Sequence, residues 1–335
     1  MNIVTYNIHS GIGLDNNYDV QRIADVIRKS GADVACLQEI EVNKVERKAR
    51  KWSAVHSDNQ PEKIAELCDM PYVAFLPCIS AYMEEGTSSS ELKVPFWKKI
   101  VGRAELLQLD EEKKSSYGLA ILSKFKILEI EDFMFSRNTE HRGDVINMDK
   151  EEQPRGAIAI LVEVPDESSG EAKHVWVVNT HLCHKFGTYE QRRQAGELDA
   201  WIKKLLATKS YGEILLEDCG VVLCGDMNSP EIFPKTGVST LVTNGWKDLW
   251  KSKGTFSKSA TMPSSVYTSE RSYLTSIMPY IGMRIDYIMS TKRPKGIEVR
   301  CDKIEVLSDK KDAVASDHCA VIAQLSLHTY SPLQI

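Results

Sequence analysis

Eight acidic, amide and imidazole side chains are the strongest candidates for chemistry, because several of them end or flank apolar runs. A charged group is rare in such surroundings unless it is paired or bound to a metal. The eight are Asn7, Glu39, His181, Asp226, Asn228, Asp286, Asp317 and His318. Carboxylates that converge on one sheet edge repel one another, and a divalent cation relieves that repulsion. Oxygen ligands suit Mg²⁺ or Mn²⁺, and no thiolate cluster favours zinc, so the set is typical of phosphate chemistry.

Each candidate also has an ordinary structural explanation when it is taken alone. Asn7 and Asn228 are of a type that often forms turns, and Asp226 could cap a helix. His318 could be a hydrogen-bonded core or surface histidine. Only the order of these residues along the chain makes a common site the better interpretation.

The first of these residues lie at the ends of strands in a βαβ-like unit. Residues 2–8 have strand-like alternation, the apolar residues of 19–29 recur at helical spacing, and Gly31 ends that helix. A second apolar strand, residues 33–38, leads directly into Glu39. Two strands joined by a helix predict parallel pairing, with Asn7 and Glu39 at the same edge of the sheet.

The later candidates also lie at or near strand boundaries, and a long helix is expected from 189 to 206. The expected strands are 118–122, 157–164, 174–181, 220–224, 284–289 and 319–325. The segment 43–70 has no clear periodicity. Residues 80–115, which include a Ser-rich tract, are expected to form an insertion in one domain spanning 1–335; a solvated insertion is favoured over one that covers the site or binds a partner.

Net charge and cysteine content limit the functions and cellular compartments that we expect for this chain. The 42 basic and 47 acidic residues give a net charge of −5, which is the wrong sign for holding long polyanions by bulk electrostatics. A basic run at 44–51 is more typical of a solvated face than of a substrate contact. Eight scattered cysteines, no signal peptide and no membrane-spanning stretch lead us to expect a cytoplasmic or nuclear protein.

Six motifs in a fixed order resemble the endonuclease/exonuclease/phosphatase superfamily, which includes apurinic endonucleases, pancreatic-type deoxyribonucleases, neutral sphingomyelinases, inositol polyphosphate phosphatases and deadenylases. The motifs are Thr5-Tyr6-Asn7-Ile8-His9, Leu37-Gln38-Glu39-Ile40, Asn179-Thr180-His181-Leu182, Gly225-Asp226-Met227-Asn228, Arg284-Ile285-Asp286-Tyr287 and Ser316-Asp317-His318. Each motif alone is weak, but together they extend over almost the whole chain. The resemblance implies a four-layer α/β/β/α sandwich in which two mixed sheets pack face to face.

The resemblance also implies roles for the candidate residues. Glu39 would be the principal metal ligand, with Asn7 beside it and Asp317 near the metal or the leaving group. The catalytic set would be His181, Asp226, Asn228, Asp286 and His318. In that set the Asp226 carboxylate would activate water, Asn228 would help to position it, and Asp286 would orient His318 and keep it cationic.

Two arginines are candidates for binding substrate phosphate. Arg155 precedes an expected strand and Arg193 lies in the helix after His181. The motif around Asn7, together with Asp58-Asn59-Gln60, looks most like compact members of the superfamily that are widespread in bacteria. A small phosphoester, phosphorylated metabolite or lipid head group is the favoured substrate; a DNA or RNA nuclease and a catalytically weak binding module are the alternatives.

Overall fold

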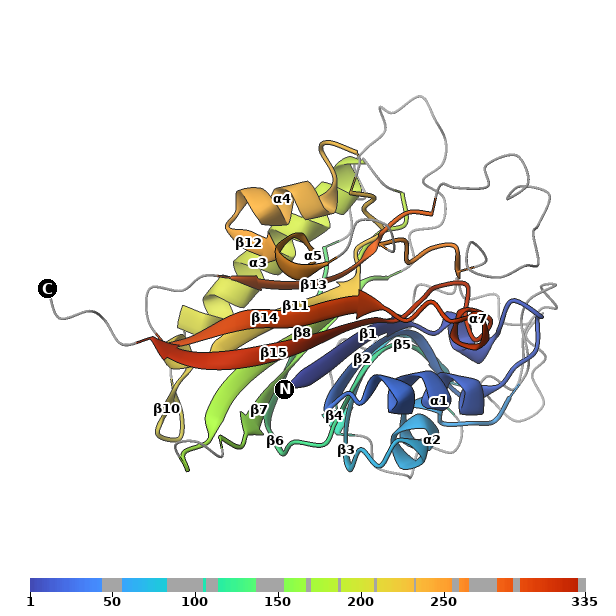
Figure 1. Cartoon of the computed structure of the whole chain (residues 1–335), viewed down its shortest axis with the longest axis horizontal. Coiled ribbons are helices and arrows are strands. Elements are labelled where there is room, and N and C mark those ends of the chain that lie inside the picture. The colour runs from blue at the N-terminus through green and yellow to red at the C-terminus, as the bar shows by residue number, and fades with distance from the viewer. Residues whose placement is uncertain are drawn as a thin grey trace, which may run out of the picture.

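The computed structural model describes residues 1–43, 56–82, 105–106, 114–136, 154–166, 170–185, 188–207, 210–231, 233–254, 259–264, 282–291 and 296–330. Two mixed β-sheets pack face to face, and helices cover the outer face of each sheet (Figure 1). This confirms the expected α/β/β/α sandwich. The basic run at 44–51 lies outside the described residues.

The first sheet contains both termini of the sandwich core. In spatial order its strands are β14 (Gly296–Val306), β15 (Val321–Tyr330), β1 (Asn2–Asn7), β2 (Val34–Val42), β5 (Lys114–Ser123), β3 (Tyr72–Tyr82) and β4 (Glu105–Leu106). Strands β1 and β2 pair in parallel, with Asn7 opposite Gln38, whereas β15 pairs antiparallel to β1. The parallel pairing expected for the first βαβ unit is therefore confirmed.

The second sheet contains the strands that bear the remaining acidic residues. Its order is β12 (Trp246–Asp248), β13 (Asp286–Thr291), β11 (Gly220–Asp226), β8 (Lys173–His181), β7 (Gly156–Val164) and β6 (Ile127–Met134). Strands β8 and β11 are parallel, and β13 runs antiparallel to β11. The end of β11 and the start of β13 therefore lie at the same edge. A separate ribbon pairs β9 (Ser210–Tyr211) with β10 (Ile214–Leu215).

Helices lie on both outer faces of the pair of sheets (Figure 1). Helices α1 (Val20–Ser30) and α2 (Gln60–Leu67) pack on the first sheet, while α3 (Tyr189–Ala207) and α4 (Gly237–Thr243) pack on the second. The short elements are α5 (Trp250–Lys253), α7 (Lys310–Ala313) and 3₁₀ turns at His9–Gly11 and Leu216–Asp218. In the described part of the chain, no helix combines the length and apolarity that a bilayer crossing requires.

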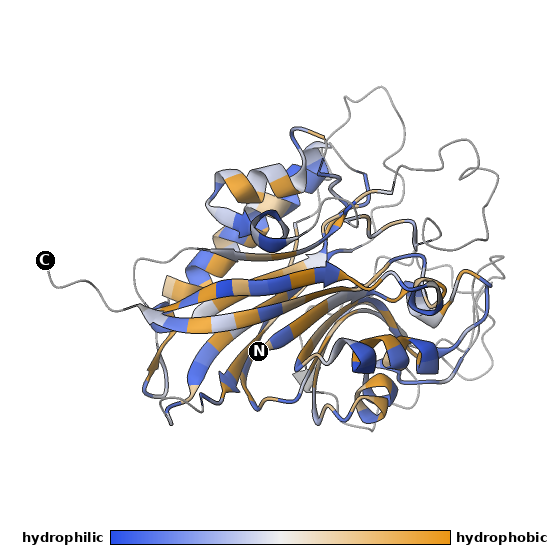
Figure 2. Ribbon diagram, in the orientation of Figure 1, coloured by the Kyte–Doolittle hydropathy of each residue, from blue (hydrophilic) through white to orange (hydrophobic). Residues whose placement is uncertain are grey.

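Three apolar clusters hold the four layers together, and strand alternation assigns residues to them. Ile3 lies between the two sheets, and the next residue, Val4, lies against α1. In the second sheet Val177 faces the other sheet and Trp176 faces α3. Figure 2 shows the same alternation of hydrophobic and hydrophilic residues along β14 and β15. Strands buried on both faces explain the nearly continuous apolar runs in the sequence.

Local signals fixed the bounds of the expected helices well. Helix α1 begins after Asp19, whose side chain accepts hydrogen bonds from the Gln21 and Arg22 amides, and it ends at Gly31 in the left-handed conformation. These are a standard N-cap and C-cap. Helix α3 agrees with the expected segment to within one residue at its C-terminal end.

Other elements differ from the expectation. Helix α2 lies in the segment for which no periodicity was recognised, and strands β3, β6 and β14 were not identified. Strands β13 and β15 each begin two residues later than expected, so Asp286 starts a strand instead of lying inside it. Within 80–115, the described residues are the end of β3, the two residues of β4 at the sheet edge and the start of β5. The rest of the expected insertion lies outside the described residues.

Candidate active site

The polar candidates of the second sheet occupy one row at its edge. Asp226, the last residue of β11, is in register with His181 at the end of β8 and with Asp286 at the start of β13. Residues directly opposite one another in neighbouring strands project their side chains to the same face. Strand register alone therefore brings these three side chains together, and all three are buried.

Asp226 is the centre of the hydrogen-bond network. Its Oδ1 accepts a hydrogen bond from the Asn228 amide at 2.8 Å, and its Oδ2 accepts one from Asn7 Nδ2 at 3.1 Å. Oδ2 also lies 3.3 Å from His181 Nε2 and 3.8 Å from His318 Nε2. Burial, followed by the charge of Asp286, raises the pKa of Asp226 to about 7. The carboxylate is therefore near its midpoint at neutral pH.

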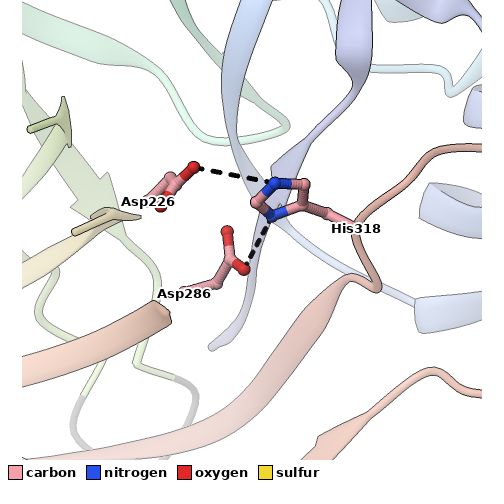
Figure 3. A group of neighbouring side chains, drawn as sticks. All are labelled: Asp226, Asp286 and His318. Carbon is pink, nitrogen blue, oxygen red and sulfur yellow. Dashed lines mark hydrogen bonds and ion pairs between the residues drawn. The ribbon is translucent and has the colours of Figure 1, made fainter. Parts of the chain in front are cut away.

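Asp286 and His318 form a buried pair beside Asp226 (Figure 3). The distance between His318 Nδ1 and Asp286 Oδ2 is 2.9 Å. Burial alone would lower the pKa of His318, but the charge and hydrogen bond of Asp286, assisted by Asp226, outweigh it and raise that pKa well above the ordinary value. The imidazole is thus cationic at neutral pH.

A short segment, 259–264, connects Asp286 with the loop that carries His318. The buried Thr261 hydroxyl accepts hydrogen bonds from the Ile285 and Asp286 amides at 3.0 and 3.2 Å. The Ser264 amide donates a hydrogen bond to Asp317 O at 2.7 Å, and the Ser264 hydroxyl donates one to Ser316 O at 2.6 Å. Neither residue was identified from the sequence, because a threonine or serine that supports other residues carries no local signal.

His181 has the opposite electrostatic environment from His318. Burial and then the charge of Arg155 lower its pKa well below the ordinary value, so the imidazole is neutral at neutral pH. Arg155 itself is buried directly before β7, and its charge acts on His181, Tyr117 and Cys183. The site therefore contains one cationic imidazole, one neutral imidazole and one buried guanidinium.

Glu39 reaches the site through a β-bulge. Gln38 and Ile40 of β2 pair with consecutive residues of β5, Leu119 and Gly118, which leaves Glu39 without a partner in the ladder. Its φ is +56°, a conformation that non-glycine residues rarely adopt. Bulges of this kind often lie beside active sites, where they redirect a side chain. The sequence located Glu39 at the end of an apolar run but did not predict the bulge.

Asn7 connects the two sheets at the site. Its Nδ2 donates to Glu39 Oε1 and to Asp226 Oδ2, each at 3.1 Å, and its Oδ1 accepts the His9 amide at 3.0 Å. Asp226 belongs to the second sheet, whereas Asn7 and Glu39 belong to the first. The site is thus assembled at the junction of the two layers.

The donor set fits a divalent cation. Glu39 offers hard carboxylate oxygens and is joined to Asp226 through Asn7 Nδ2. Burial and then the charge of Asp286 disfavour the charged form of Asp226, and a cation would offset that cost. Asp226, Asp286 and His318 also place one potential ligand atom each within 4.8 Å of one another. In that cluster, however, Asp286 raises the pKa of His318 well above the ordinary value, and a protonated imidazole has no nitrogen lone pair for a metal.

The remaining candidates differ in how close they lie to this network. Asn228 donates its side-chain amide to Leu182 O at 3.1 Å, beside His181. Asp317 is partly exposed, and its Oδ1 lies 3.8 Å from His9 Nδ1. Arg193 is instead engaged by Glu190 and Glu197 of its own helix and by Ser136. The structure brings Asn228 and Asp317 to the site but gives Arg193 structural partners.

Comparison with known proteins identifies the family of the chain. The model of the endonuclease/exonuclease/phosphatase family matches residues 4–318. No protein with curated function matches the chain. An endonuclease/exonuclease/phosphatase from Beutenbergia cavernae is 20% identical, has a TM-score of 0.59, and the match covers 98% of this chain and 71% of that one.

Two further solved structures share the fold. Mannosyl-6-phosphatase Bt3783 of Bacteroides thetaiotaomicron is 16% identical with a TM-score of 0.61, and the match covers 97% of this chain and 99% of that one. D. rerio TDP2 complexed with a single strand DNA product is 15% identical with a TM-score of 0.56, covering 97% and 98%. At such identities the likeness shows the fold alone. The match over 4–318 shows that this chain belongs to the endonuclease/exonuclease/phosphatase family of divalent-metal-dependent phosphoester hydrolases.

Proposed function

We propose that the chain hydrolyses a phosphoester of a small or lipid-derived substrate by metal-assisted attack of water. The observation that carries this proposal is the arrangement around Asp226 Oδ2, which has Asn7, His181 and His318 within 3.8 Å. A carboxylate with a pKa of about 7 can accept a proton from water at neutral pH. The two imidazoles lie where they can contact the phosphoryl oxygens of a substrate held against it.

The proposed reaction divides the work between these groups. Asp226 takes a proton from the attacking water while the water oxygen forms its bond to phosphorus. The cationic His318 and the neutral His181 donate hydrogen bonds to phosphoryl oxygens, where negative charge develops. The leaving oxygen departs with the bonding electron pair and takes up a proton from solvent water, and Asp226 afterwards releases its proton to solvent. Asp286 acts through His318 by holding its ring in place and stabilising its charge.

The metal-binding residues in this proposal are Glu39, Asn7 and Asp317. Mg²⁺ is the proposed ion and Mn²⁺ the alternative, since all the ligand atoms are oxygens. A bound divalent cation supplies charge neutralisation at the phosphoryl group. The buried Arg155, whose charge acts on His181, is proposed to bind a second phosphoryl oxygen.

Net charge supports a small substrate, and one comparison supports the second candidate, a nuclease. The chain's net charge of −5 provides no general attraction for a polyanion. The D. rerio TDP2 structure, by contrast, contains a single strand DNA product on the same fold. A binding module without activity is disfavoured, because the buried side chains of Asp226, His181, Asp286 and His318 form one cluster with contacts of 3.8 Å or less.

A substrate panel tests the proposal and separates the candidates. Purified protein with Mg²⁺ is assayed against p-nitrophenyl phosphate, bis(p-nitrophenyl) phosphate, sugar phosphates, lipid phosphoesters and single-stranded DNA. We expect turnover of a small phosphoester that Asp226→Asn abolishes. DNA cleavage whose KM rises steeply with salt would favour the nuclease. No turnover with Mg²⁺ or Mn²⁺, or turnover that survives Asp226→Asn, would disprove the proposed chemistry.

The two candidate phosphate-binding arginines form a matched pair for a second test. Arg155→Met removes a buried charge beside His181, and we expect KM for the substrate found above to rise about tenfold or more. Arg193→Met breaks the contacts with Glu190, Glu197 and Ser136, so we expect lower thermal stability with little change in KM. The reverse result would assign substrate binding to the helix.

A further inference from the structure

The two segments that carry Asn7 and Glu39 both contain strained backbone. His9 and Ser10, directly after β1, have φ values of +46° and +56°, and Glu39 has a φ of +56°. Left-handed conformations of non-glycine residues persist only when the surrounding structure holds them. Both segments therefore need external support if their side chains are to keep a fixed separation.

One buried side chain contacts both segments. Gln60 has no solvent exposure, and its Oε1 accepts a hydrogen bond from the Glu41 amide at 2.7 Å, two residues after Glu39. Its Nε2 donates to Ser10 O at 2.8 Å, three residues after Asn7. A single planar amide thus joins the bulged strand to the strained turn.

Gln60 is itself held in a rigid environment. It is the first residue of α2, whose N-cap is Asn59, and the neighbouring His56 ring stacks on Tyr18 with centroids 4.5 Å apart. A Cβ atom added at Gly11 would lie 3.3 Å from Gln60 Nε2, so the turn approaches this amide closely. These contacts leave the Gln60 side chain little freedom to relax.

We infer that Gln60 is a positioning residue that presets Asn7 and Glu39 for a hard divalent cation by tying together the Ser10 turn and the Glu39 bulge. The inference rests on the proposed metal role of Asn7 and Glu39. Gln60 touches neither the substrate nor the ion in this arrangement; it acts through the backbone of the two ligand-bearing segments. Residues that orient metal ligands typically change metal affinity by about 10- to 100-fold when they are replaced.

The test measures Mg²⁺ and Mn²⁺ dissociation constants by isothermal titration calorimetry, without any substrate. Gln60→Met keeps the length of the side chain but removes both hydrogen bonds, and we expect its dissociation constants to rise about 10- to 100-fold. Gln60→Asn keeps an amide but withdraws it by one carbon atom, so we expect a smaller rise. Circular dichroism and thermal melts establish that each variant is folded.

The matched control is Gln194→Met, which removes another buried glutamine that accepts a backbone hydrogen bond, from Cys183 at 2.8 Å, away from Asn7 and Glu39. We expect it to lower the melting temperature but leave metal affinity unchanged.

Glu39→Gln tests the proposed metal role of Glu39 separately from the role of Gln60. Unchanged metal affinity in that variant would refute the proposed metal role itself. Weakened binding in Glu39→Gln with unchanged binding in a folded Gln60 variant would overturn only the role of Gln60. Failure of both Gln60 variants to fold would make Gln60 a folding residue and would also overturn this inference.

Discussion

At the scale of single residues, the site separates the protonation states of groups that lie side by side. Asp226 and Asp286 are both buried carboxylates, but Asp286 is paired with His318, whereas Asp226 has a pKa raised to about 7. His181 and His318 are shifted in opposite directions. Neighbouring groups with pKa values pushed apart are typical of acid–base sites.

Asp226→Asn is expected to stabilise the metal-free protein while abolishing activity. The pKa of Asp226 is raised from an ordinary value of 3.8 to about 7 in the folded state, so the folded protein binds this proton more tightly than the unfolded chain. Stability is therefore lost as pH rises from about 4 to about 7. We expect Asp226→Asn to raise the free energy of unfolding by on the order of 1–3 kcal/mol above that pH range and to leave it unchanged below that range.

Urea unfolding of the wild type and of Asp226→Asn, in the presence of EDTA across this pH range, measures the effect. A stability difference between the two proteins that does not change with pH would show that the pKa of Asp226 is not raised in the folded state.

Asp286→Asn is expected to move the alkaline limb of the pH–rate profile to lower pH. The charge and hydrogen bond of Asp286 keep His318 cationic against the effect of burial. Without them, burial dominates and the imidazole loses its proton at a lower pH. Profiles of kcat/KM for the two proteins, recorded with the same substrate, check this; an alkaline limb that stays in place would assign it to another group.

At the scale of elements, two adjacent irregularities shape the strand that carries Glu39. Gly118 of β5 lies between the bulge at Glu39 in β2 and a second register shift in β3, between Pro77 and Ile79. A Cβ at Gly118 would lie 1.9 Å from Leu76 O, a backbone atom, so no larger residue fits without displacement of β3. Glycine at this position permits the two bulges to lie side by side.

Gly118→Ala is expected to destabilise the protein by about 1–3 kcal/mol or more and to weaken Mg²⁺ binding, because overpacking must shift the backbone next to Glu39. Thermal melts and calorimetric Mg²⁺ titrations measure both effects. The control is Gly196→Ala in helix α3, where an added Cβ meets nothing within 4 Å. We expect Gly196→Ala to raise the free energy of unfolding by about 0.5–1 kcal/mol, because alanine favours the helix, and to leave the Mg²⁺ affinity of the protein unchanged. Equal behaviour of the two variants would contradict the packing argument.

At the scale of the whole molecule, the site crosses the interface between the two sheets. Asn7 and Glu39 come from the first sheet, and Asp226, Asp286 and His181 come from the second. The apolar cluster between the sheets lies beneath this junction and sets their spacing. A cation bound beside these carboxylates would therefore join two layers that otherwise meet mainly through apolar packing.

Mg²⁺ is accordingly expected to stabilise the fold. At a concentration 100-fold above its dissociation constant, a ligand that binds only the folded state adds about 2.7 kcal/mol. Differential scanning fluorimetry with and without Mg²⁺ should show a higher melting temperature in the wild type and in Glu298→Gln, which changes an acidic residue of β14 paired with Arg300. Glu39→Gln should lose most of the shift, and a shift retained in that variant would place the ion elsewhere.

The sequence by itself determined the features that depend on local pattern and on motif order. Helical spacing over 19–29 and Gly31 located α1, apolar runs marked most strands of the core, and six ordered motifs indicated the family, the fold and the candidate residues. These features can be predicted from the sequence because helix caps, strand periodicity and residue type each depend on only a few neighbouring positions of the chain. Helix α2 was missed because it has only eight residues, and strands β3, β6 and β14 were missed because a register shift in each interrupts the regular alternation.

Only the tertiary structure decided how the residues meet. The register of β8, β11 and β13 aligned Asp226 with His181 and Asp286, and the Glu39 bulge directed a side chain that ordinary strand alternation would not place. Gln60 and Arg193 acquired their partners in the same way. Distances between residues more than two hundred positions apart, such as Asn7 and Asp226, depend on the packing of two sheets, and no local pattern contains that information.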